Sequence, residues 1–133
     1  MANVIDFGKS VPASFSQTAT LPVRRLPNST ILGQFGLSVG ANGLVLLEAT
    51  LGLNNNTANA ADIIFSIARN GVQIYTARSS SWNANNYGAV HLTFTDSGIT
   101  AGYYGYALVA SATGTGNPPL IVGPLVFSGL SIS

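Results

Sequence analysis

The sequence predicts an all-β protein: an antiparallel β-sandwich in the form of an eight-stranded jelly roll, with a flexible N-terminal arm. Three observations support this fold class. Short apolar segments alternate with polar residues, residues typical of turns separate these segments, and no long stretch repeats its apolar residues at the helical period of about 3.6. Eight short antiparallel strands in a 133-residue chain suit a double-sheet jelly roll, and this length is that of one domain.

The first 19 residues are predicted to be separate from the jelly-roll domain, which would occupy residues 20–133. Val4, Ile5 and Phe7 form a small apolar cluster, and a polar, serine-rich stretch follows them. This segment holds too few apolar residues to fold alone. We therefore expect an arm or connector that becomes ordered only where it docks on another surface.

Eight strands are expected in the rest of the chain. β-branched residues and glycine are frequent, whereas Glu, Lys and Gln, which favour helices, are scarce. Residues 44–47 are apolar on both faces of their strand, which predicts that a second layer or another subunit covers them. The last strand is expected to be interrupted at Gly123-Pro124. The predicted strands are residues 21–26, 30–39, 44–53, 62–69, 72–79, 87–96, 102–111 and 120–132.

The dipeptide Asn70-Gly71 predicts the best-defined turn. It suits a type I′ turn, in which both central residues need a positive φ. A two-residue turn also sets the register of the two strands that it joins. The expected pairs are Arg69 with Val72, Ile67 with Ile74, and Phe65 with Thr76, with Ile63, Phe65 and Ile67 on the core side.

Charged residues make up only 7% of the chain, and the net charge is +1. Binding of nucleic acid or of an anionic membrane requires a basic patch, so both partner classes are excluded. The chain has no cysteine, which excludes disulfides, thiolate metal sites and cysteine nucleophiles. Gly, Ser, Thr and Asn supply 52 of the 133 residues. This nearly uncharged composition favours self-association, although it also fits a β-rich domain with polar loops.

Targeting and membrane signals are not expected either. The N-terminal segment lacks the basic and apolar regions of a signal peptide. No apolar run approaches the roughly 18 residues that span a bilayer, so membrane insertion is not expected.

Few side chains are candidates for catalysis. His91 is the only imidazole, and the chain has no Gly-x-Ser-x-Gly motif that would present a nucleophile. We expect His91 on the polar face of a strand. Asp62 is expected to begin a strand and Asp96 to begin a turn.

Glu48 stands out among the carboxylates because apolar residues flank it. We expect it to form a structural ion pair with Arg24, Arg25, Arg69 or Arg78, or to face a pore, rather than to act in catalysis. No spacing of His and carboxylate residues fits a metal site. We expect no catalytic, cofactor-binding or metal-binding residues, and the protein is not expected to be an enzyme.

An asparagine-rich loop offers one candidate ligand site. Trp82 and Tyr87 bracket Asn83 and Asn85, and an aromatic platform beside amide groups is a pattern seen in sugar-binding loops. The alternative interpretation is a loop that its aromatic residues anchor to the fold.

Four stretches together resemble small spore-surface proteins of spore-forming bacilli, from the exosporium or from spore appendages. They are LVLLEATLGL from Leu44, DIIFSIARNGVQIY from Asp62, LTFTDSGITAGYYGYAL from Leu92, and VGPLVFSG from Val122. The resemblance implies a jelly roll like the globular heads of tumour necrosis factor and complement, usually trimeric. It also implies deposition on the spore without a signal peptide. The chain departs from collagen-stalked spore glycoproteins, since it has no Gly-X-Y repeat, and from disulfide-linked fibre subunits, since it has no cysteine.

These observations lead to one expected function and one alternative. The protein is expected to be a structural subunit of a spore-surface layer or appendage fibre that self-assembles as homotrimers. The N-terminal arm would link the trimers, with Val4, Ile5 and Phe7 docking into a neighbouring trimer. Other spore-surface proteins are further candidate partners. The alternative is a trimeric head domain that binds a glycan or a receptor.

Overall fold

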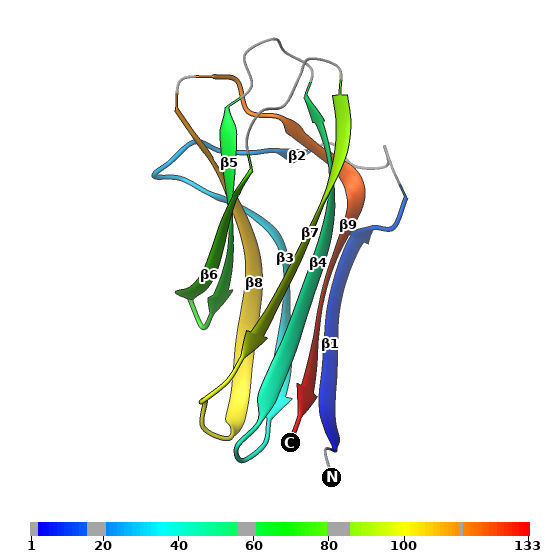
Figure 1. Ribbon diagram of the computed structural model, residues 1–133, viewed down its shortest axis with the longest axis vertical. Coiled ribbons are helices and arrows are strands. Elements are labelled where there is room, and N and C mark those ends of the chain that lie inside the picture. Colours follow the sequence, from blue (N-terminus) through cyan, green and yellow to red (C-terminus); the bar gives the residue numbers. More distant parts are fainter. Residues whose placement is uncertain (1–2, 16–20, 56–60, 80–85, 115) are drawn as a thin grey trace.

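Two sheets lie face to face in the computed structural model, with their strands running along the long axis of the molecule (Figure 1). The structure describes residues 3–15, 21–55, 61–79, 86–114 and 116–133. The strands in these residues are β1 (Val4–Ala13), β2 (Leu21–Pro22), β3 (Thr30–Val39), β4 (Leu44–Asn55), β5 (Asp62–Arg69), β6 (Val72–Ser79), β7 (Asn86–Asp96), β8 (Gly102–Thr113) and β9 (Leu120–Ile132).

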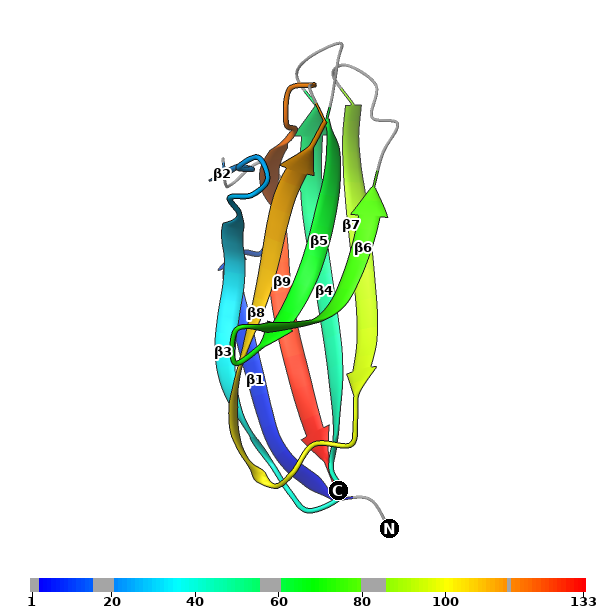
Figure 2. The same cartoon turned by 90° about the vertical axis from the view of Figure 1, so that its left-hand side faces the viewer.

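The strands divide into a five-stranded and a four-stranded sheet. Sheet A has the order β1-β9-β4-β7, and the short β2 also pairs with β9. Sheet B has the order β3-β8-β5-β6. Figure 2 shows sheet B nearest the viewer with sheet A behind it. All pairs of named strands are antiparallel, which confirms the predicted antiparallel β-sandwich.

The chain crosses repeatedly between the two sheets. Successive strands from β2 to β9 lie in different sheets, except for the β5–β6 hairpin. Eight of the strands are long, and they form two layers of four. This connectivity is compatible with the predicted jelly roll.

Alternating side chains from both sheets fill the space between the layers. Leu47 and Leu51 of β4 and Phe65 and Ile67 of β5 are almost completely buried. Phe35 packs between the sheets against Tyr106 and Phe127, with ring centroids 5.9 and 4.8 Å away. Burial of these side chains supplies most of the free energy that holds the two sheets together.

Glycines give the Phe35 ring the room that it needs. A Cβ atom on Gly8 of β1 would lie 2.5 Å from Cδ2 of Phe35, and one on Gly129 of β9 would lie 2.8 Å from Cζ. Both distances are far below van der Waals contact. The ring can therefore lie against sheet A only because these two strands carry glycine where it touches them.

The expected flexible arm is wrong for the residues that form β1. Val4–Ala13 pair with β9 of the same chain, with Phe7 opposite Leu130 and Gly8 opposite Gly129. Without β1, one edge of β9 would expose unpaired backbone donors and acceptors. The separation of arm and domain between residues 19 and 20 therefore does not hold for β1, which is part of the sandwich.

The first predicted strand, residues 21–26, is much shorter in the structure. Only Leu21–Pro22 pair with β9 of sheet A. Val23 then enters the core, and the backbone of Arg24 and Leu26 bonds to Ala112 of β8 in sheet B. The segment crosses from one sheet to the other, so its backbone cannot continue along either edge.

The β5–β6 hairpin confirms the predicted turn and corrects the predicted register. Asn70 and Gly71 both have a positive φ, 48° and 82° respectively. Arg69 pairs with Val72 as expected. A register shift between Ile67 and Ala68 then displaces the remaining pairs by one residue. The observed pairs are Ile67 with Tyr75 and Phe65 with Ala77, in place of Ile74 and Thr76.

The predicted interruption at Gly123-Pro124 takes the form of a local irregularity. β9 continues through both residues, but its pairing with β4 shifts register between Leu51 and Leu53. Gly52 lies opposite this shift, and a Cβ on it would overlap the backbone of Gly123. The described part of the chain contains no helix long and apolar enough to cross a membrane.

Candidate functional site

The outer face of sheet A carries two rows of apolar side chains near the end of the sandwich where both chain termini lie (Figure 1). Residues directly opposite each other on neighbouring antiparallel strands point to the same face of a sheet. In the middle of each row lies β9, with β1 on one side and β4 on the other. We call these six residues the apolar face: Val4, Ile132 and Leu44 in the first row, and Phe7, Leu130 and Leu46 in the second.

Solvent reaches much of the apolar face. Val4 is 68% exposed and Phe7 is 57% exposed, while Leu44 and Leu46 are each 38% exposed. A β-bulge at Ile5 accounts for the three-residue spacing that brings both Val4 and Phe7 to this face. Isolated exposed apolar residues are ordinary, but a contiguous set of this kind is typical of an interaction surface.

Two opposite charges lie in the next row along the same strands. Lys9 of β1 pairs with Ser128 of β9, and Ser128 pairs with Glu48 of β4. Both charged side chains are exposed, and neither takes part in an ion pair among the described residues. The outer face thus offers apolar surface bordered by one cation and one anion.

The expected ion pair of Glu48 with an arginine is therefore wrong. Leu47 and Ala49 point into the core, so the alternation of a strand turns Glu48 outward. Three of the four arginines considered as partners are engaged elsewhere: Arg69 binds Asp96, Arg78 binds Asp62, and Arg25 donates to the carbonyls of Gly114 and Gly116. Arg24 forms no ion pair with Glu48 either.

His91 lies on the exposed face of β7, as expected. Its Nδ1 is 3.1 Å from Oγ1 of Thr50. The hollow beside them measures about 60 Å³. This is well below the roughly 300 Å³ of the smallest ordinary ligand pockets, so the hollow is too small for a substrate.

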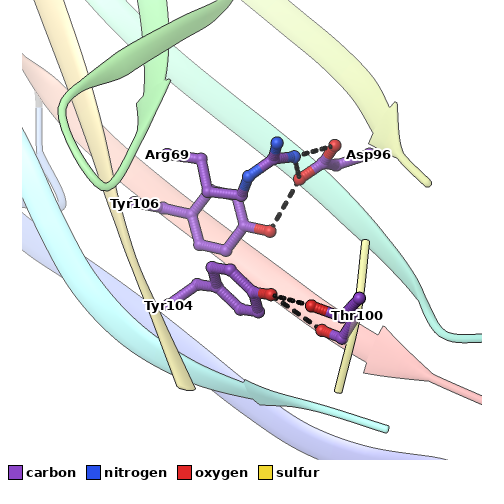
Figure 3. Close-up of polar contacts among 5 residues, drawn as sticks. All are labelled: Arg69, Asp96, Thr100, Tyr104 and Tyr106. Atoms are coloured by element: carbon purple, nitrogen blue, oxygen red, sulfur yellow. Dashed lines mark hydrogen bonds and ion pairs between the residues drawn. The ribbon is translucent and has the colours of Figure 1, made fainter. Parts of the chain in front are cut away.

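A polar cluster connects the two sheets (Figure 3). Arg69 of β5 donates from Nη1 to both carboxylate oxygens of Asp96 of β7, at 2.6 Å each. The hydroxyl of Tyr106 in β8 donates to Oδ2 of Asp96 at 2.8 Å. Asp96 thus belongs to sheet A, and its two partners belong to sheet B.

Tyr104 extends this cluster toward solvent. The guanidinium carbon of Arg69 lies 5.9 Å from the centre of its ring, within cation–π range. Its hydroxyl donates to the carbonyl of Thr100 at 2.8 Å (Figure 3). Asp96 was expected to begin a turn, and it does end β7, but its carboxylate is buried.

The protonation states of this cluster suit a structural role, not an acid–base role. Burial and the hydrogen bond to Asp96 raise the pKa of Tyr106, so its proton stays in place. The hydrogen bond to Asp96 likewise raises the pKa of Arg69. A general acid or base needs a pKa near the working pH, and neither group meets this requirement.

The other ionic side chains in the described residues do not form a second polar cluster. Arg78 and Asp62 form an exposed ion pair across the β5–β6 hairpin at 2.6 Å. Both oxygens of Asp6 accept backbone N–H groups, those of Phe7 and Ser38, and these bonds lower its pKa. Among the described residues no three His, Asp or Glu side chains are close enough to hold a metal ion.

The outer face of sheet B contains two open hollows of about 470 and 590 Å³. Small side chains line them, including Ser66, Gly105 and Ala107. The described lining residues include no Asp, Glu, His, Lys or Arg. These hollows lack the convergent charged groups that would orient a substrate for reaction.

The structure locates part of the predicted site. Val4, Ile5 and Phe7 all lie in β1, with Val4 and Phe7 on the apolar face. The predicted ligand loop with Trp82, Asn83 and Asn85 lies outside the described residues. Tyr87 is in β7, and nothing is described of its side chain.

Four members of the apolar face were not among the predicted site residues: Leu44, Leu46, Leu130 and Ile132. A signal for two of them was present in the sequence. Residues 44–47 are apolar on both faces, and the structure covers only the inner face, through Val45 and Leu47. The other two could be found only once β9 was paired with β4.

No protein-family model and no curated protein matches this chain.

Proposed function

We propose that this protein is a non-enzymatic structural subunit that assembles with copies of itself, as homotrimers, into a layer or appendage fibre on the surface of a bacterial spore. The exposed apolar face of sheet A is the observation that carries this proposal. Burial of a large apolar side chain contributes roughly 1.5–3 kcal/mol, and six such residues lie together. The spore surface and the trimer rest on the resemblance of the four sequence stretches.

The nearly neutral surface favours the same interpretation. With five basic and four acidic residues, long-range repulsion between copies is weak. Two of the four carboxylates are held in ion pairs within the chain. Little electrostatic work therefore opposes contact between apolar faces.

The N-terminal segment would link copies as part of the sandwich and not as a free arm. Val4 and Phe7 present their side chains from a strand that is already paired with β9. Removing residues 2–12 would uncover both the β9 edge and the Phe35 ring, so a truncated protein would test folding rather than linkage. Point substitutions on the outer face are the better test.

The experiment compares two double variants of matched exposure. V4S/F7S changes side chains that are 68% and 57% exposed on sheet A, and I31S/V72S changes side chains that are 58% and 64% exposed on sheet B. Light scattering after size-exclusion chromatography and negative-stain electron microscopy report assembly, and circular dichroism reports folding. We expect wild type and I31S/V72S to assemble, and V4S/F7S to remain folded with its assembly constant reduced at least tenfold.

Two outcomes would contradict the proposal. A wild-type protein that stays monomeric at millimolar concentration does not self-assemble as proposed. Equal loss of assembly in both double variants would show that the apolar face has no special role. Immunogold labelling of intact spores from the producing cells tests the location, and label confined to the mother-cell cytoplasm would oppose it.

A further inference from the structure

We propose that the apolar face binds the same face of a second copy about a twofold axis that runs along β9, with Lys9 of each copy opposite Glu48 of the other. This inference rests on the proposed function and specifies the partner and the geometry of one contact. Its support is the arrangement of charged and apolar residues in the three rows.

β9 is the natural centre of the contact. β1 and β4 flank it on either side, each about 4.8 Å away, so Lys9 and Glu48 lie about equally far from it on opposite sides. Ser128 separates them in the same row. This row is therefore nearly symmetric about β9 in position, but opposite in charge at its two ends.

A half-turn about an axis along β9, lying in the contact plane, exchanges the two sides. Every residue keeps its position along the strands, while β1 of one copy comes to lie over β4 of the other. Lys9 then faces Glu48, Phe7 faces Leu46, and Val4 faces Leu44. Leu130 and Ile132 meet their own counterparts near the axis, so apolar rows contact apolar rows and each charge meets its opposite.

The other twofold arrangement of the same faces is less favourable. An axis across the strands would place β1 over β1 and reverse the order of the rows. Lys9 would then meet either another Lys9 or an apolar residue such as Phe7. An unpaired charge against apolar surface loses its hydration without compensation, whereas opposite charges compensate each other.

Charged side chains are rare in this protein. Nine side chains of the 133 residues are formally charged at neutral pH, and two ion pairs within the chain use four of them. Lys9 and Glu48 occupy the same row of the same face, beside the apolar face, and have no ion-pair partner in the described part of the chain. A second copy provides a partner for both at once. Each twofold contact closes on itself and would join one protomer of one trimer to one protomer of another. Because a trimer carries three such faces, contacts of this kind would link it to further trimers.

Charge reversal tests this geometry. K9E and E48K each place like charges opposite each other twice in every contact, so we expect the dissociation constant of the pair to rise at least tenfold in sedimentation equilibrium. K9E/E48K restores opposite charges at both positions. We expect this double variant to associate within about threefold of wild type.

Mixing the two single variants gives a sharper readout. In a complex of one K9E chain with one E48K chain, both contacts join opposite charges, so the mixture should associate at least tenfold more tightly than either variant alone. R78E and D62K change the net charge by the same amounts on sheet B. Mixing these two controls should give no comparable gain, which separates local pairing from general attraction between oppositely charged proteins.

A measurement on the wild type completes the test. Carbodiimide joins a lysine amine to a carboxylate in contact with it, and a mixture of isotopically light and heavy chains identifies links between copies. We expect a Lys9–Glu48 link between copies. If the wild type assembles but forms no such link, and single reversals assemble as well as wild type, the twofold contact is wrong while the proposed function stands. A wild type that never assembles overturns the proposed function itself.

Discussion

The side chain of Asp96 forms bonds between the two sheets. It ends β7 in sheet A, yet its carboxylate accepts from Arg69 and Tyr106 of sheet B. Its side chain is 7% exposed. A buried carboxylate is stable only while its hydrogen-bonding partners remain. The bonds from Arg69 and Tyr106 to Asp96 therefore hold the two sheets together.

D96N should destabilise the fold by about 2–4 kcal/mol, because it removes the charge that Arg69 and Tyr106 are arranged to bind. The matched control is D62N, which removes the exposed ion pair with Arg78 and should cost less than about 1 kcal/mol. Guanidinium unfolding followed by circular dichroism measures both. Equal losses in the two variants would mean that the inter-sheet position of Asp96 adds nothing.

Tyr106 makes stability depend on pH in the alkaline range. Its pKa is raised in the folded protein by burial and by its bond to Asp96, whereas an unfolded tyrosine ionises near pH 10. The contribution is fully present below pH 10 and is lost as pH rises above it, because only the unfolded chain releases the proton there. The free energy of unfolding should fall by up to about 1.4 kcal/mol per pH unit above 10. In Y106F the decline measured between pH 8 and 11 should be smaller, and an unchanged decline would assign it to other groups.

At the scale of single elements, β1 shows how an edge strand joins the sandwich. Its ladder with β9 completes sheet A, and its glycine admits the Phe35 ring from the core. An edge strand gains less burial than a central one, which is why its sequence alternates weakly and resembles a polar connector. The tertiary context decides its structure.

G8A tests this packing. Its new methyl group would overlap Phe35, which Tyr106 and Phe127 hold in place, so we expect a loss of about 1–3 kcal/mol in the free energy of unfolding. Gly102 at the start of β8 is the control, since a Cβ there meets only ordinary contact with Tyr104. G102A should therefore change stability by less than about 0.5 kcal/mol. Comparable losses in both variants would contradict the role of the Phe35 contact.

At the scale of the whole molecule, the small net charge and the apolar face together determine how copies interact. Because the net charge is only +1, sodium chloride has little repulsion to screen. Sodium sulfate, in contrast, strengthens apolar burial. At equal ionic strength, sedimentation velocity should show more assembly in sulfate than in chloride. Because equal ionic strength screens charges equally, the same assembly in both salts would point to electrostatic association in place of apolar contact.

Much of the fold could be predicted from residue patterns alone. The strand bounds 30–39, 62–69, 72–79 and 120–132 agree with the structure, because alternation and turn residues are local signals. The β5–β6 register could not be predicted beyond its first pair, since a bulge depends on how the strands pack. Of the apolar face, Val4 and Phe7 were predicted site residues, but their neighbours come from strands distant in sequence.

The sequence by itself determined an antiparallel β-sandwich, its main strands and its nearly uncharged surface, since these follow from local alternation, turn residues and composition. Only the tertiary structure decided that Val4–Ala13 form a strand, that Glu48 faces outward, and that Lys9 shares its row. The physical reason is that strand pairing joins residues far apart in the chain. Which face of a sheet each one occupies depends on a register that no single segment encodes.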